Sequence, residues 1–120
     1  MGESEKEKRI KREKSRLTRF YRDLVGAKKG IAAGLIERAA FMRVQCEDLE
    51  KDLNENGWTA PFSQGNQEPY DRARPQGQAY QTLNANYQKI IRQLDAMLPP
   101  EKETPQSDGF DDFVNGRGEL

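Results

Sequence analysis

Residues 31–57 carry a heptad-type apolar stripe, and this stripe constrains the fold more than any other feature of the sequence. Its apolar positions follow one another at alternating steps of four and three, which places them on one face of a helix. They are Leu35, Ala39, Met42, Cys46, Leu49 and Leu53. Gly57 suits the left-handed position that ends a helix, with Trp58 placed to pack back on Leu53. The pattern predicts a helical rod ~39 Å long, at ~1.5 Å per residue.

A second stripe with the same spacing follows Pro75, a residue that suits the first turn of a helix. It ends at Pro99-Pro100 and contains Tyr80, Leu83, Tyr87, Ile90, Leu94 and Met97. Two rods of similar length joined by one connection predict a long antiparallel helical hairpin over residues 31–98. Residues 57–74 show no clear periodicity, so we interpret them as a loop that aromatic side chains fix to the body.

Composition indicates a small, elongated, all-helical chain that self-associates. Its 120 residues suffice for one domain, and only 34% of them are hydrophobic while 33% are charged. A long rod cannot cover its own stripe, and two stripes offer more apolar surface than one hairpin can bury. We therefore predict a closed homo-oligomer with several subunits.

Charge is distributed unevenly, although the formal net charge is zero. Residues 1–30 have a net charge of +6, residues 31–100 of −2 and residues 101–120 of −4. A basic N-terminal region and an acidic C-terminal region favour two different partners.

The basic region, residues 1–30, is predicted to form a helix or arm. Ser4 and Glu7 have the spacing of a capping box, so a helix is expected to begin near Glu5. Its first half has only Ile10 to bury, which predicts a solvated segment that orders on contact, whereas residues 17–25 are expected to pack on the body. Residues 26–30, GAKKG, are interpreted as a turn. A helix-turn-helix fragment and a plain helical pair both fit this pattern.

The C-terminal residues 99–120 form an acidic tail that is predicted to be disordered. The tail holds a short apolar island among carboxylates: Phe110, Asp111, Asp112, Phe113 and Val114. Such an island is typical of a segment that folds onto a partner protein. A chance scatter of apolar residues in a solubilising tail is the alternative.

Residues that commonly carry catalysis are few. The chain has no histidine and no phosphate-binding glycine loop, and its single cysteine, Cys46, lies on the apolar stripe as a small buried hydrophobe. Acidic residues between Glu47 and Glu55 surround one helix and are interpreted as its solvated face. We therefore expect no enzyme, no cofactor and no metal. The charged N-terminus and short apolar runs predict no secretory signal and no membrane span, and the lone cysteine fits a reducing cytosol.

Three segments together resemble the small subunit of the terminase of tailed bacteriophages, in the compact form found in phages of Gram-positive hosts. They are GLIERAAFMRVQCEDLEKDLNENG, RPQGQAYQTLNANYQKIIRQLDAMLP and DGFDDFV, and the similarity covers residues 16–114. The resemblance implies a ring-type homo-oligomer that recognises double-stranded viral DNA. It also implies recruitment of the large subunit, the ATPase and nuclease, to start genome packaging in the cytoplasm of the infected bacterial host.

The resemblance also assigns roles to parts of this sequence. The two stripes would build the ring and the tail would dock on the large subunit. Only about 30 residues precede the central helix, too few for a three-helix DNA-binding module, so the basic arm is expected to hold phosphates. The residues concerned are Lys8, Arg9, Lys11, Arg12, Lys14, Arg16, Arg19, Arg22, Lys28 and Lys29. A generic helical-hairpin adaptor or scaffold without DNA binding is the alternative.

Overall fold

The computed structural model describes residues 2–24 and 26–99. Along the chain come α1 (Glu5–Phe20), α2 (Gly26–Asn56), β1 (Thr59–Phe62), β2 (Tyr70–Ala73) and α3 (Pro75–Met97). The chain is mostly helical in its described part, but the prediction of an all-helical chain is wrong at the two short strands. The predicted docking motif lies outside the described residues; its members are Phe110, Asp111, Asp112, Phe113 and Val114.

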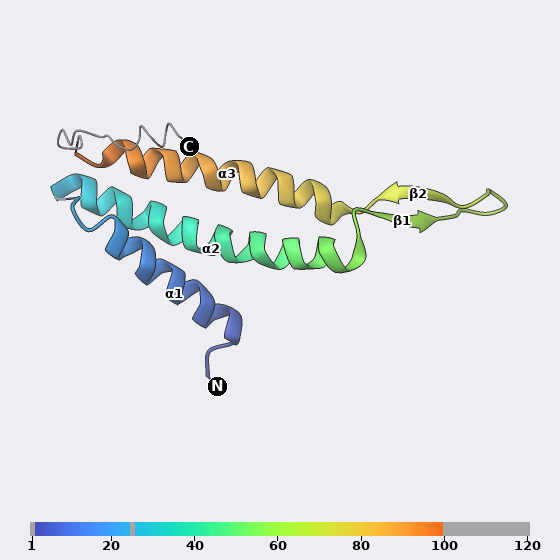
Figure 1. Cartoon of the computed structure of the whole chain (residues 1–120), viewed down its shortest axis with the longest axis horizontal. Helices are drawn as coiled ribbons and strands as arrows, with labels where there is room; N and C mark the ends of the chain where they lie inside the picture. The colour runs from blue at the N-terminus through green and yellow to red at the C-terminus, as the bar shows by residue number, and fades with distance from the viewer. Residues whose placement is uncertain (1, 25, 100–120) are drawn as a thin grey trace, which may run out of the picture.

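Helix α2 is the centre of the molecule, and both α1 and α3 pack against it (Figure 1). Helix α3 runs back alongside α2, so its C-terminal end returns to the N-terminal end of α2. The molecule measures 67 × 45 × 22 Å. A thickness of 22 Å corresponds to about two helices of ~10–12 Å diameter, so the described residues leave no room for a third layer.

Helix α1 begins at the predicted capping box. The Ser4 hydroxyl accepts a hydrogen bond from the Glu7 backbone N–H at 3.0 Å, and the Ser4 backbone N–H donates to Glu7 Oε1 at 3.0 Å. Both groups are then satisfied at the helix start. The first half of α1 forms a regular helix that ion pairs and the partly buried Ile10 hold against the body, whereas the fully buried apolar contacts come from Leu17, Tyr21 and Leu24.

The predicted turn at residues 26–30 is wrong, because these residues are the first turn of α2. The chain reverses direction earlier, at Tyr21–Asp23, and Gly26 has a φ of +64°. A glycine adopts this conformation without the strain of a Cβ. Residues 27–30 contain no residue that breaks a helix, since Gly30 costs only ~1 kcal/mol there.

The predicted loop at residues 57–74 is instead a β-hairpin that projects beyond the ends of α2 and α3 (Figure 1). Strands β1 and β2 pair antiparallel, with Phe62 opposite Tyr70. The strands have only four residues each, too few for an alternating pattern to stand out in the sequence. The predicted helix end is confirmed, since Gly57 has a φ of +85° and its N–H donates to the Leu53 carbonyl at 2.8 Å.

Arg74 and Trp58 fix the base of this β-hairpin. Both Asp52 carboxylate oxygens accept from Arg74 Nη2 at 3.0 Å, and the Gly57 carbonyl accepts from its Nη1 at 2.5 Å. The Trp58 ring, expected on Leu53, lies against Gly77 and packs edge-on to Tyr80, with ring centroids 6.3 Å apart. The base is thereby tied to both long helices.

The core lies where α2 meets the other two helices. Ile36, Ala40 and Val44 recur every four residues and are buried, which makes a second buried row on α2 beside the predicted heptad stripe. A helix packed between two others needs two apolar rows, and the heptad count found only one of them. Leu94 of α3 and Leu24 are fully buried and close the core near the α1–α2 turn.

Candidate nucleic-acid interface

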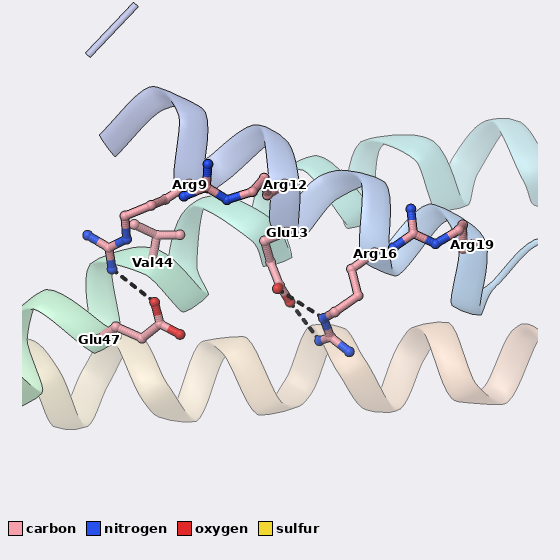
Figure 2. Close-up of a pocket in the computed structure, with 7 residues that line it drawn as sticks. All are labelled: Arg9, Arg12, Glu13, Arg16, Arg19, Val44 and Glu47. Carbon is pink, nitrogen blue, oxygen red and sulfur yellow. Dashed lines mark hydrogen bonds and ion pairs between the residues drawn. The ribbon is translucent and has the colours of Figure 1, made fainter. Parts of the chain in front are cut away.

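Four arginines share one side of α1, because they follow at steps of three and four. They are Arg9, Arg12, Arg16 and Arg19. Together with Glu13 of α1 and with Val44 and Glu47 of α2 they line an open groove of about 370 Å³, the arginine groove (Figure 2). In the sequence these arginines are only part of a run of basic residues. The helix brings them to one surface.

Two of these arginines are engaged in ion pairs within the chain. Arg9 binds Asp48 at 2.7 Å and Glu47 at 2.9 Å. Arg16 donates to both carboxylate oxygens of Glu13, at 3.0 and 2.7 Å. Hydrogen bonds to these acids raise the pKa of both guanidinium groups. Arg12 and Arg19, by contrast, make no ion pair with another residue in the described part of the chain.

Glu13 is the centre of a charge network that links all three helices. Its side chain is only 12% exposed and lies between Arg16 and Arg43, whose Nε is 3.8 Å from it. Arg43 also approaches Glu47 at 3.5 Å and donates to the Tyr87 hydroxyl of α3 at 3.3 Å. This role of Arg43 was not predicted. In the sequence, its only sign is an arginine that directly follows a residue of the heptad stripe, Met42.

The lysines in the first ten residues of α1 are also neutralised by acids. Lys14 pairs with Glu37 at 3.0 Å, and Lys6 pairs with Asp48 at 2.9 Å. Lys8 lies 3.7 Å from Glu5, and Lys11 pairs with Glu3. Much of the basic charge in the first half of α1 therefore holds the helix together or holds it against α2.

Cations without such partners gather where α1 meets α2. Arg22, Lys28 and Lys29 form what we call the turn cluster, and none of them makes an ion pair with a residue at positions 2–24 or 26–99. Arg22 and Lys29 line one depression of about 130 Å³. Lys28 lines a second depression of about 140 Å³, which also holds Asp23 and Pro99.

The structure thus divides the predicted DNA-binding residues into two sets. One set is engaged in ion pairs among the described residues: Lys8, Arg9, Lys11, Lys14 and Arg16. The other set makes no such pair among the described residues and consists of two exposed arginines of the arginine groove and the three cations of the turn cluster: Arg12, Arg19, Arg22, Lys28 and Lys29. The second set keeps its donors available, and arginine and lysine donors of this kind bind phosphate oxygens.

The residues predicted for self-association also fall into two sets. Four are buried within the single chain and cannot contact a second copy: Ala39, Cys46, Leu53 and Leu94. Burial raises the pKa of the Cys46 thiol, which agrees with its expected role as a small hydrophobe. The others are half-buried: Leu35, Met42, Leu49, Tyr80, Leu83, Tyr87 and Ile90.

Apolar side chains along the α2–α3 pair stay partly exposed among the described residues, and we call this surface the open apolar face. It consists of half-buried apolar side chains: Leu35, Met42 and Leu49 of α2 and Leu83, Ile90 and Met97 of α3. Leu35, Ile90 and Met97 also pack against the buried core. Ile31 and Phe41 flank this face and are 59% and 51% exposed. Beside them an open groove of about 450 Å³ is lined by Gly34, Glu37, Arg38, Phe41 and Met42.

Other kinds of site find no support among the described residues. None of the described helices is long and apolar enough to cross a membrane. No group of three or more acidic or cysteine side chains in the described ranges is arranged to hold a metal ion. Comparisons with protein-family models, with curated proteins and with solved structures find no match.

Proposed function

We propose that this chain is a DNA-binding, self-associating subunit that acts in viral genome packaging as a terminase small subunit. In this role it binds double-stranded viral DNA through its basic surface and assembles into a ring through an antiparallel helical hairpin, α2 with α3. Its C-terminal tail recruits the large subunit in the cytoplasm of the infected bacterial host. The chain itself performs no catalysis.

The observation that carries the proposal is the set of cations that the fold leaves without acidic partners among the described residues. Arg12 and Arg19 are exposed in the arginine groove, and Arg22, Lys28 and Lys29 form the turn cluster where α1 is connected to α2. Acids of α2 neutralise other cations of the same arm, so this set stands out against its surroundings. Cations held on a helix and a tight turn suit the phosphates of a duplex, which attract them whatever the base sequence.

The open apolar face supports the self-association part of the proposal. Exposed apolar surface rimmed by polar residues is typical of a protein–protein interface. Ile31 and Phe41 would lose their exposure if a second copy covered this face.

A second candidate function is a helical-hairpin adaptor or scaffold without DNA binding. The ion pairs of Lys6, Arg9 and Lys14 with α2 favour it, because they give half of the basic arm a structural role. In that case the arm would contact an acidic protein or only solvate the molecule.

Duplex binding by matched charge variants separates the two candidates. Lys28→Gln with Lys29→Gln removes two charges from the turn cluster. Arg12→Gln with Arg19→Gln removes two charges from the arginine groove. Lys51→Gln with Lys89→Gln removes two charges from exposed positions elsewhere and serves as the control. Each variant is titrated into a fluorescent duplex of mixed sequence, and anisotropy gives the affinity.

Each of the first two variants is expected to bind about tenfold or more weakly than the wild-type chain at ~0.1 M salt, because two phosphate contacts are lost. The control should bind like the wild type. Equal weakening by all three variants would mean that net charge alone matters, and no binding by the wild-type chain would favour the adaptor.

A further inference from the structure

Pro99, the last described residue, lies beside the turn cluster. It lines the same small depression as Lys28, together with Asp23, Leu24 and Met97. Helix α3 runs back along α2, so the chain leaves its C-terminal end beside the N-terminal end of α2 (Figure 1). The segment that follows therefore starts next to the cations of the cluster.

The segment that follows carries the opposite charge. Residues 101–120 have a net charge of −4, and their acids are Glu101, Glu103, Asp108, Asp111, Asp112 and Glu119. The turn cluster has three cations, and Asp23 is the acid that shares a depression with one of them. Opposite charges are thus carried by the turn cluster and by the segment that follows Pro99 in the sequence.

The length of the segment permits contact. A chain spans at most ~3.3–3.6 Å per residue, so Glu101 lies within ~7 Å of Pro99 and Glu103 within ~14 Å. The acids further on, at positions 108–119, can reach the turn cluster and also Arg19 and Arg12, which lie within one α-helix of ~24 Å.

We propose that the acidic residues 101–119 dock on the turn cluster of their own chain and thereby compete with nucleic acid for it. An attached acid needs little intrinsic affinity, because a short linker holds it at an effective concentration near the millimolar range. Exposed charge pairs of this kind are weakened by salt. Duplex DNA displaces the acids only where its phosphates make more contacts with the chain than the tail does. The competition therefore disfavours weak binding of the chain to DNA through few phosphates. The docking stands by itself, whereas the competition rests on the DNA binding proposed above.

Carbodiimide cross-linking of the full chain tests the docking without any DNA. The reagent joins a lysine amine to a carboxylate in direct contact, with net loss of water, and mass spectrometry locates the bond. We expect bonds from Lys28 or Lys29 to acids between 101 and 119, which disappear at 1 M salt. Lys51 and Lys89 serve as internal controls on exposed helix surfaces.

Two results would overturn the docking. The first is a yield at Lys28 and Lys29 no higher than at Lys51 and Lys89. The second appears in an equal mixture of ¹⁵N-labelled and unlabelled protein whose subunits have exchanged. Bonds within one chain never join a labelled to an unlabelled peptide, so mixed bonds in about half of the cross-links, the statistical share, would mean that the tail belongs to a neighbouring copy.

Duplex titration tests the competition. A variant with all six tail acids changed to Gln or Asn should bind about tenfold more tightly at 50 mM salt, and the gain should vanish near 200 mM. Lys28→Arg with Lys29→Arg keeps the charge but removes the amines, so it should lose the cross-links and retain the wild-type affinity. Equal affinity of wild type and tail variant at 50 mM would refute competition. Cross-links in a chain that binds no duplex would uphold the docking while refuting the proposed function.

Discussion

The Tyr21 hydroxyl donates a hydrogen bond of 2.7 Å to Asp95 Oδ1, which joins the end of α1 to α3 across 74 positions of sequence. Tyr21 itself is buried, with 4% of its surface exposed. Burial first, and then the bond to Asp95, raises the pKa of Tyr21 far above its ordinary value. The phenol therefore stays protonated, and a hydrogen-bond donor, at neutral and mildly alkaline pH. The bond fixes the α1–α2 turn beside the last turn of α3.

Tyr21→Phe is expected to destabilise the chain by about 1 kcal/mol, because the ring stays buried while one hydrogen bond is lost. Urea denaturation followed by circular dichroism gives the free energy of unfolding. Tyr70→Phe, on the exposed β-hairpin, is the control and should change little. Equal stability of Tyr21→Phe and the wild type would show that the bond to Asp95 contributes nothing.

Gly77→Ala is expected to loosen the base of the β-hairpin. A Cβ on Gly77 would lie 2.8 Å from Trp58 Cε3 and 3.3 Å from Cζ3, closer than atoms pack, so the ring must move. Such overpacking costs ~1–3 kcal/mol. Gly30→Ala in α2 is the matched control, since its Cβ would meet nothing within 4 Å and alanine favours a helix by up to ~1 kcal/mol. The prediction fails if both variants raise the melting temperature.

Acid is expected to release the first half of α1 from α2. Hydrogen bonds from Arg9 first, and then from Lys6, lower the pKa of Asp48. The pairing therefore stabilises the fold fully above the ordinary carboxyl pKa near ~3.9 and is lost as pH falls below it. Asp48 is 38% exposed, so solvent screens the pairs and the contribution stays below ~1 kcal/mol.

Asp48→Asn should remove this dependence. The difference in melting temperature between wild type and variant is expected to be positive at pH 6 and to shrink towards pH 2.5. Asp71→Asn on β2 is the control, because Asp71 makes no ion pair with a residue in the described ranges. A difference that is the same at both pH values would contradict an ionic role for Asp48.

Phe41→Glu is expected to weaken self-association without unfolding the chain. Phe41 is 51% exposed at the edge of the open apolar face, so a carboxylate there remains solvated in a monomer but is unfavourable in an interface. Sedimentation velocity gives the mass of the particle. Ala85→Glu places the same charge on an exposed part of α3 and should leave the assembly intact. An unchanged particle mass for Phe41→Glu would exclude this face from the interface.

The start of α1, the end of α2 and the start of α3 were predictable from the sequence because local residues determine them. Ser4 with Glu7, Gly57 and Pro75 act within one turn of their own helix, and each is found in the predicted role. The turn predicted at residues 26–30 is misplaced, because Gly26 and Gly30 do not interrupt the helix there. The chain instead reverses where Tyr21 and Leu24 are buried, which depends on contacts with distant residues.

The candidate site was predictable only as a list of residue types. Composition indicates a basic arm, but it cannot tell Arg9, which pairs with Asp48, from Arg12, which has no such partner among the described residues. That distinction depends on which acids of α2 face α1, 38 or 39 positions away in the sequence. The β-hairpin escaped detection for a related reason, since four-residue strands are defined by their pairing rather than by their own pattern.

The salt dependence of duplex binding by the wild-type chain tests the central claim most directly. If the exposed cations of α1 and the turn cluster hold about five phosphates per subunit engaged, log K should fall against log salt concentration with a slope near −4.5. Duplexes of unrelated sequence should give the same slope, because phosphates carry no base information. A slope near zero, or no duplex binding at 50 mM salt, would contradict the account and leave the chain as an adaptor.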